Sequence, residues 1–204
     1  MIVTELEKIS ADRFKVFIDC EFAFVLYKGE LCHYHLAEGQ IIQESDYKEI
    51  TESLLPKRAK LRAMNLLQKK CYTERQLMDK LKEGFYSEKM IEDAVAYVKS
   101  FHYLDDLQYA VDYLTYYENK KSQRKLEADL RQRGIPEAVL HQAFLKWREQ
   151  GGSQDEMQMI KELLRKKQYD PGCSEKEKHR IYTFLLRKGF SVDHVNSALS
   201  GTKF

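Results

Sequence analysis

Three segments of the chain share one pattern, in which a helical stretch with spaced leucines runs into a glycine and an apolar residue before a second amphipathic stretch begins. The copies are LMDKLKEGF with Gly84, LEADLRQRGI with Gly134 and IYTFLLRKGF with Gly189. An interval of about fifty residues between copies indicates stacked supersecondary units rather than one enzyme core. Such arrays leave one long face free for a polymeric partner. The pattern therefore predicts a mainly α protein of tandem three-helix repeats in an elongated curved array.

The composition is that of a folded protein, with 204 residues, 43% hydrophobic and 32% charged. No apolar run approaches the roughly twenty residues that cross a bilayer, and the start, MIVTELEKIS, lacks the apolar region of a secretory signal. The cysteines show no C-x-x-C spacing, which suits a reducing compartment, and we interpret them as small hydrophobes. They are Cys20, Cys32, Cys71 and Cys173. We predict a cytoplasmic protein without a membrane segment.

Residues 1–55 are predicted to form an N-terminal segment whose first part, up to about residue 36, carries the alternating pattern of β-strands. The alternating apolar residues are Phe14, Val16 and Ile18 in RFKVFID, and Phe22, Phe24 and Leu26 in EFAFVLY. A tight turn at Asp19 and Cys20 joins the two segments, and a second reversal at Gly29 precedes LCHYHL. We therefore predict a small N-terminal antiparallel β-hairpin or meander up to about residue 36. A short helix over Gln43 to Leu54 follows.

Residues 56–104 are predicted to form the first three-helix repeat, with Pro56 at the start of a helix because proline discourages helix in the residue before it. The inward face of this helix is predicted to carry Leu61, Met64, Leu67 and Cys71. Thr73 and Gln76 form a capping box for the second helix, which is predicted to end at Gly84 in a left-handed conformation. The third helix begins after Ser87 and is predicted to bury residues up to Phe101.

Residues 105–152 and 153–204 are predicted to form the second and third repeats. The second has an apolar stripe at Ala110, Tyr113, Leu114 and Tyr117, then Leu126 and Leu130, and a helix after Pro136 with Trp147 facing inward. The third has Ile160 and Leu164, a capping box at Ser174 and Glu177, and Val195 and Ala198 near its end.

The formal net charge is only +2, so any affinity for an acidic partner must come from local clusters. Six basic residues and no acid lie between Lys57 and Lys70. The candidate basic contacts recur in successive repeats: Arg58, Arg62 and Lys69; Lys121, Arg124, Lys125 and Arg131; Lys166, Lys167, Arg187 and Lys188. A solvated face remains an alternative for each group. The second group is predicted to form a solvent face of one sign, interrupted mainly by Glu127 and Asp129, and alignment of the groups on one side is a hypothesis.

Other residues have both a functional and a structural interpretation. Asp105 and Asp106 could hold magnesium, but two acids at a helix start are typical of capping. Cys32, His33 and His35 lack a fourth metal ligand nearby. Tyr109, Tyr113, Tyr116 and Tyr117 could stack on bases, although Tyr113 and Tyr117 lie on the apolar stripe and Tyr116 is freer. Common nucleotide-binding, metalloprotease and hydrolase motifs are absent from the sequence. We predict no catalytic residue, metal or cofactor.

FHYLDDLQYA, from Phe101 to Ala110, followed by a basic helix with LRQRGI and later by LLRKGF, resembles the bacterial RecX family of RecA regulators. DCEFAFVL resembles the β-hairpin that many members carry ahead of their repeats. The positions that carry the motif are Tyr103, Leu104, Asp105, Asp106, Tyr109, Ala110 and Gly134. The family often has glycine where this hairpin has Cys20, and the first repeat has one residue fewer between Leu81 and Gly84. A positive φ at a cysteine costs about 1 kcal/mol, so we expect a different turn type.

The resemblance implies a non-catalytic regulator that lies in the groove of the RecA filament on single-stranded DNA and limits its ATPase, strand exchange or extension. It also implies roles in homologous recombination, DNA repair and the SOS response, for a protein that acts as a monomer. The alternative from the residues themselves is a helical repeat protein that binds nucleic acid directly and affects RecA by competition for DNA. The sequence leaves both open.

Overall fold

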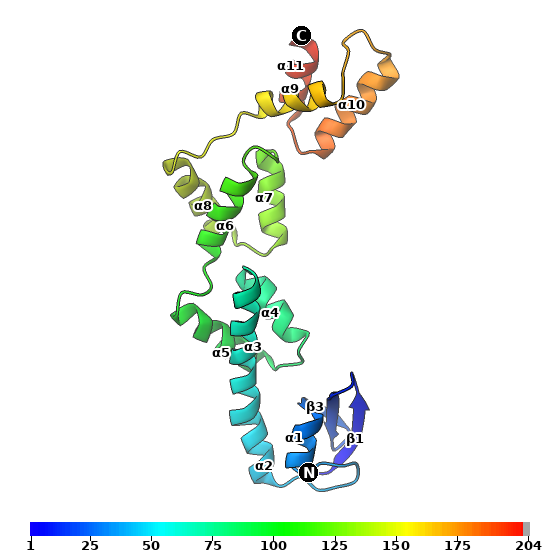
Figure 1. The fold of residues 1–204 in the computed structure, drawn as a ribbon, viewed down its shortest axis with the longest axis vertical. Helices are drawn as coiled ribbons and strands as arrows, with labels where there is room; N and C mark the ends of the chain where they lie inside the picture. The colour runs from blue at the N-terminus through cyan, green and yellow to red at the C-terminus, as the bar shows by residue number, and fades with distance from the viewer. Residues whose placement is uncertain (202–204) are drawn as a thin grey trace. The chain divides into compact units, whose positions relative to one another are not determined.

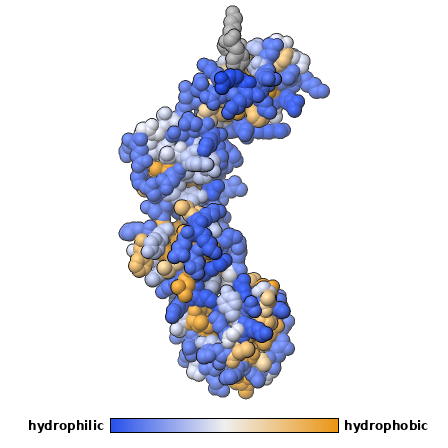
Figure 2. All heavy atoms as spheres, viewed as in Figure 1, coloured by the Kyte–Doolittle hydropathy of each residue, from blue (hydrophilic) through white to orange (hydrophobic). Residues whose placement is uncertain are grey.

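The computed structural model describes residues 1–201 and is mainly helical, with one small sheet near the N-terminus (Figure 1). The chain divides into two compact units, of which the first covers Met1–Asp105 and the second begins at Asp106. Each is built from short amphipathic elements around its own core clusters. On the visible face, hydrophobic residues gather over the first unit, whereas the second unit is mostly hydrophilic (Figure 2).

The first unit begins with a three-stranded antiparallel sheet in the order β1-β2-β3. The strands are β1 (Val3–Lys8), β2 (Arg13–Ile18) and β3 (Glu21–Tyr27). The predicted meander is confirmed, but the strand predicted after Gly29 is wrong. Residues Lys28–His33 form helix α1, because Leu31 and Leu36 then bury together against the sheet. The Glu30 carboxylate accepts a hydrogen bond from the Tyr27 backbone nitrogen at 2.7 Å and caps this helix.

The turn between β2 and β3 has positive φ at both central residues, 49° at Asp19 and 69° at Cys20. Two positive φ angles are typical of the hairpin turn that matches the right-handed twist of its strands. The expectation of another turn type at Cys20 is therefore wrong. The start of β1 fastens the turn, since the Ile2 nitrogen donates to Asp19 Oδ1 at 2.9 Å and the Cys20 nitrogen donates to Thr4 Oγ1 at 3.0 Å. Phe22, predicted on the core face, is 44% exposed because the register shifts between Val16 and Phe17.

Pro56 lies in the first turn of helix α3 (Leu55–Lys69), as predicted, but helical turns also precede it. Helix α2 (Glu44–Lys48), a π turn η1 (Glu49–Leu54) and helix α3 follow one another without a break, and Figure 1 shows α2 leading directly into α3. Proline lacks the N–H of a regular helical bond, and its ring crowds the carbonyl four residues earlier. The wider π turn lies immediately before Pro56 and relieves this conflict. Leu55 keeps helical angles, φ −67° and ψ −44°.

The inward face of α3 differs from the prediction. Ala59, Ala63 and Leu66 are buried, whereas Leu61 is 51% exposed and Cys71 is exposed. Small alanines allow the backbone of α5 (Glu88–Ser100) to pack closely on α3, which a stripe of large side chains would prevent. Met64 and Leu67 pack on the flank of the core, half-buried. The buried face of α3 is therefore rotated around the helix axis relative to the predicted inward face.

The predicted capping box of α4 (Glu74–Lys82) is confirmed at Thr73 and Gln76. The left-handed residue after α4 is Phe85 (φ 63°), so the prediction for Gly84 is wrong. In the later repeats Gly134 (φ 87°) and Gly189 (φ 92°) take this conformation, each four residues after a buried leucine. The same spacing from Leu81 selects Phe85. A side chain on Gly84 would instead approach the ring of Tyr86 to 2.7 Å, so close packing requires this glycine.

The second unit contains two core clusters. One is formed by α6 (Asp106–Tyr117), α7 (Gln123–Gln132) and α8 (Glu137–Glu149), and the other by α9 (Glu156–Lys166), α10 (Glu175–Arg187) and α11 (Val192–Gly201). The predicted inward residues Leu126, Leu130, Trp147, Ile160 and Leu164 are buried. Tyr117 is half-buried. The boundaries proposed for three repeats stay a prediction.

The interpretation of the cysteines as small hydrophobes is wrong for Cys20, Cys32 and Cys71, which are exposed, and Cys173 is half-buried. All four are free thiols. Among residues 1–201, the helices are too short or too polar to pass through a bilayer.

Candidate functional site

A cationic cleft of about 320 Å³ lies between the start of α7 and the end of α10 in the second unit. Its basic residues come from two parts of the sequence that the predicted groups kept separate. The cleft is lined by Lys120, Lys121, Ser122, Lys125, Leu163, Phe184, Arg187, Lys188 and Phe190. Four of the predicted candidates, Lys121, Lys125, Arg187 and Lys188, therefore meet in one place. The cleft combines positive charge at its rim with an apolar floor.

Ser122 and Gly189 hold the two helix ends together. The Ser122 hydroxyl donates to the backbone oxygen of Lys188 at 3.0 Å and accepts from the Lys125 nitrogen at 3.3 Å, as the N-cap of α7. Ser122 is fully buried. A side chain at Gly189 would overlap with this hydroxyl and press against Lys125. The absence of a side chain at Gly189 thus permits the close approach of α10 to α7.

Asp129 neutralises part of the positive charge. Its carboxylate pairs with Lys121 at 2.7 Å and with Lys125 at 2.9 Å, and the Tyr113 hydroxyl donates to it at 3.0 Å. Burial alone would raise the pKa of Asp129, but these hydrogen bonds outweigh burial and lower the pKa to about 2. Burial opposes the charged form of Lys121, but its bonds to Asp129 and Tyr113 raise its pKa. Asp129, which was predicted to interrupt the basic face of α7, therefore pairs with two of the four cations of that face.

Aromatic rings accompany several of these cations. The ammonium of Lys120 lies 3.6 Å from the ring centre of Tyr116, and Lys121 lies 4.1 Å from that of Tyr117. Phe184 has Lys167 at 5.2 Å and Lys188 at 5.7 Å from its ring centre. Such contacts hold a cation in place without neutralising it. Lys120 and Phe184 were not among the predicted contact residues. The basic pair Lys120-Lys121 beside Ser122 is a signal that could have indicated Lys120.

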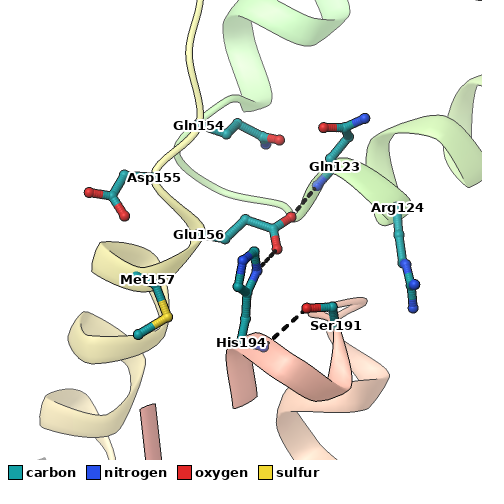
Figure 3. Close-up of a pocket in the computed structure, with 8 residues that line it drawn as sticks. All are labelled: Gln123, Arg124, Gln154, Asp155, Glu156, Met157, Ser191 and His194. Carbon is teal, nitrogen blue, oxygen red and sulfur yellow. Dashed lines mark hydrogen bonds and ion pairs between the residues drawn. The ribbon is translucent and has the colours of Figure 1, made fainter. Parts of the chain in front are cut away.

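Arg124 lies outside this cleft and lines a neighbouring pocket of about 590 Å³ (Figure 3). Glu156 points to the start of α7, where its carboxylate accepts from the Gln123 nitrogen at 2.9 Å and pairs with His194 Nδ1 at 2.9 Å. Serine, histidine and glutamate are the residue types of a hydrolytic triad. Here, however, the Ser191 hydroxyl accepts from the backbone nitrogen of His194 at 3.1 Å. This bond caps α11, and the group fastens α9 and α11 to α7.

A third depression, of about 590 Å³, shares Phe184 and Arg187 with the lining of the cleft. It is lined by Lys167, Glu177, His179, Arg180, Ile181, Thr183, Phe184 and Arg187. Lys166 is exposed at the end of α9 and is absent from the lining of either depression beside Phe184. Lys167 and Arg180 thus extend the basic surface beyond the cleft.

Two predicted contact residues instead form ion pairs away from the cleft. Arg131 bonds Glu137 at 2.9 Å and Glu127 at 3.4 Å at the opposite end of α7. These contacts raise the pKa of Arg131 and lower that of Glu137. Arg58, in the first unit, pairs with Glu30 at 2.7 Å and also donates to the Val25 carbonyl oxygen.

The guanidinium of Arg58 lies 5.0 Å from the ring centre of Tyr27 and 6.0 Å from that of Tyr86. Its side chain is 17% exposed. Because Tyr27 and Val25 belong to β3 while Arg58 belongs to α3, this residue joins the sheet to the first helical repeat. The prediction of a basic face shared by Arg58, Arg62 and Lys69 is therefore wrong for Arg58. Arg62 and Lys69 are exposed on α3.

The motif positions are mainly structural. Leu104 and Ala110 are buried, and Gly134 supplies the left-handed residue after α7. The Tyr109 hydroxyl accepts from Arg133 Nη1 at 2.8 Å. Asp106 is the first residue of α6, and Asp105 precedes it. Tyr103 differs from the rest because its side chain is 58% exposed.

Residues 1–201 contain no group of three or more His, Cys, Asp or Glu side chains placed to hold a metal ion. Cys32, His33 and His35 lie on and just after α1, and not on the strand that was predicted after Gly29. The cationic cleft is therefore the site with the clearest capacity to bind an anionic partner.

Comparison with known proteins gives one consistent result. The model of the third three-helix domain of RecX matches residues 154–199. A regulatory protein RecX from Caldanaerobacter subterraneus subsp. tengcongensis is 28% identical over 99% of this chain and 100% of its own length. That of Bacillus subtilis (strain 168) is 26% identical over 97% of this chain and 75% of its own length.

Two solved structures share the fold. A crystal structure of regulatory protein RecX has a TM-score of 0.61 at 22% identity and covers 97% of this chain and 98% of that one. RecX from Lactobacillus salivarius has a TM-score of 0.56 at 20% identity, covering 73% and 97%. The domain match, the relatives that align over nearly the whole chain and the shared three-helix fold agree. The chain therefore belongs to the RecX family of regulatory proteins.

Proposed function

We propose that this protein is a non-catalytic cytoplasmic regulator that binds the RecA filament on single-stranded DNA along its groove. It limits RecA ATP hydrolysis, strand exchange and filament extension, as a monomer and without a cofactor. The roles in homologous recombination, DNA repair and the SOS response follow from this activity. The observation that carries the proposal is the cationic cleft between α7 and α10.

The cleft is suited to an extended anionic partner. Five of its lining residues are cations, and Asp129 is the carboxylate that pairs with two of them. Arg187 and Lys188 belong to no ion pair among the described residues, so their charge is available to a partner. The apolar floor at Leu163, Phe184 and Phe190 suits a protein surface as well as a nucleic acid. RecA filaments on DNA present both.

The test is RecA-catalysed ATP hydrolysis on single-stranded DNA, titrated with this protein and using the cognate RecA. Wild type is expected to lower the rate. The variant Arg187→Glu/Lys188→Glu should need a protein concentration at least about tenfold higher, because reversing two rim charges replaces attraction with repulsion. The matched control, Lys161→Glu/Lys176→Glu, makes the same charge change at exposed residues of α9 and α10 outside the cleft. An unchanged rate at several-fold excess of wild type over filament sites would contradict the proposal.

The second candidate is a direct nucleic-acid binder that acts by competition for DNA, which the aromatic rings beside the cations favour. Charge reversal at Arg124 and Lys125 separates the two functions. If these changes abolish DNA binding without RecA but leave the effect on the filament intact, the protein acts through RecA. Parallel loss of both activities would favour competition. For five phosphate contacts the log-log salt slope on single strands would be about −3.5.

A further inference from the structure

The first unit carries an exposed aromatic pair that the cationic cleft does not use. Phe101 and Tyr103 are 51% and 58% exposed, although both are large hydrophobic side chains. Their rings stack, with centres 5.9 Å apart and an angle of 18° between planes. Tyr97 packs its edge against Phe101 at 5.0 Å. The expectation that Phe101 completes the core is therefore wrong, and the pair presents a ring surface to solvent.

The backbone fixes this display. His102, between the two rings, has a left-handed φ of 57°, and the Tyr103 nitrogen donates to the Val98 oxygen at 3.1 Å. These features form a cap at the end of α5, in which a hydrophobic residue usually covers the last turn. Leu104 is the next residue that turns inward, and it is 5% exposed. Because the capped turn directs Phe101 and Tyr103 outward, the two rings keep their positions without burial.

Beside Tyr103 lies a cleft of about 240 Å³, lined also by Met64, Leu67 and Gln68 of α3. The amide of Gln68 offers both a donor and an acceptor to a ligand edge. Lys57 and Lys60 precede Met64 on the same stripe of the helix, at the i, i+3 and i+7 positions. Lys60 places its ammonium 5.2 Å from the ring centre of Tyr97. The rings and the nearby cations thus belong to one face.

Flat exposed rings beside cations suit unpaired bases, which stack on aromatic side chains while the phosphates meet lysine or arginine. Of the residues along this stripe, none is acidic between Lys57 and Lys70. This positive charge favours a polyanion as the ligand over an apolar protein segment that has no acidic residues. We propose that Phe101 and Tyr103 form a stacking site for unpaired bases of single-stranded DNA, with Lys57 and Lys60 near its phosphates. The choice of DNA over RNA rests on the proposed function.

The experiment measures binding to fluorescently labelled oligothymidylate in the absence of RecA. The variant Phe101→Leu/Tyr103→Leu keeps apolar side chains but removes both rings, and its affinity should fall about tenfold or more. The control Phe101→Tyr/Tyr103→Phe exchanges the rings and should bind like wild type. An abasic strand of equal length keeps the phosphates but has no bases, so wild type should bind it as weakly as the leucine variant binds oligothymidylate.

A direct readout comes from Tyr103→Trp, because stacking of a base on the new indole ring should quench its fluorescence. Trp147 is buried at 4% exposure and contributes a constant background. Absence of DNA binding by wild type, equal binding of the abasic strand, or an unchanged affinity of the leucine variant would overturn the stacking site. If the leucine variant instead loses only its effect on RecA, the rings dock a protein and the inference is overturned. The proposed function fails separately, when wild type leaves RecA ATP hydrolysis unchanged.

Discussion

Replacement of Gly189 by alanine tests how the cationic cleft is built. Gly189 has a φ of 92°, and the methyl group of alanine would overlap with the Ser122 hydroxyl. The left-handed backbone alone costs about 1 kcal/mol for a residue with a side chain. Overlap with Ser122 weakens the bond to the Lys188 oxygen, worth about 1 kcal/mol, and adds packing strain of about 1 kcal/mol or more. We expect Gly189→Ala to lower the free energy of unfolding of the second unit by about 3 kcal/mol.

Gly151 provides the matched control, because its φ of 88° is similar but a side chain there would meet nothing within 4 Å. Gly151→Ala should therefore cost about 1 kcal/mol, from backbone strain alone. Urea unfolding followed by the fluorescence of Trp147, the one tryptophan of the sequence, measures both variants in the same unit. The double variant Ser122→Ala/Gly189→Ala makes room for the methyl group, so its cost should be smaller than the sum of the two single costs. Equal losses for the two glycine variants, or strict additivity, would refute the close approach of α10 to α7.

Two further predictions concern charged residues inside the units. The pKa of Asp129 is lowered to about 2, below its unfolded value near 4, so its ion pairs stabilise the fold above pH 4. This contribution, about 2 kcal/mol, should be lost as the pH falls from 4 toward 2, and Asp129→Asn should remove that part of the pH dependence in urea titrations. Arg58→Ala should destabilise the first unit by about 3 kcal/mol because it leaves a half-buried partner charge unpaired. The control Arg62→Ala, on the exposed side of the same helix, should change the free energy of unfolding by less than about 0.5 kcal/mol. Limited proteolysis compares the two variants, and equal sensitivity of both would contradict the role of Arg58.

Features that depend on neighbouring residues in the chain could be predicted from the sequence. The N-caps Thr73 and Ser174 were identified because a glutamine or glutamate, the partner residue of a capping box, lies three residues after each of them. Helix α1 could not be predicted in the same way, since its stability comes from burial of Leu31 and Leu36 against a sheet formed elsewhere. The left-handed residue of the first repeat was misplaced because glycine was used as the signal, whereas the spacing from Leu81 decides the position.

The candidate site was predictable only in part. The basic residues themselves were identified, but their pairing depends on contacts distant in sequence. The bond between Ser122 and the Lys188 oxygen spans 66 residues, and no periodicity reports it. Helical wheels also cannot show which cations are neutralised. Arg58 and Arg131 bind carboxylates away from the cleft, and Lys121 and Lys125 share Asp129.

Arg187 and Lys188 have a structural interpretation as well, because cations at the end of α10 complement the partial negative charge of its last carbonyl groups. This interaction contributes at most about 1 kcal/mol at an exposed helix end and is screened by salt. Contact with an anionic partner has a much larger consequence, since reversal of both charges also repels the partner. A stability loss of about 1 kcal/mol or less in Arg187→Glu/Lys188→Glu, combined with a large loss of the effect on RecA, would therefore assign these residues to partner binding. A large stability loss would instead assign them to the joint between α7 and α10.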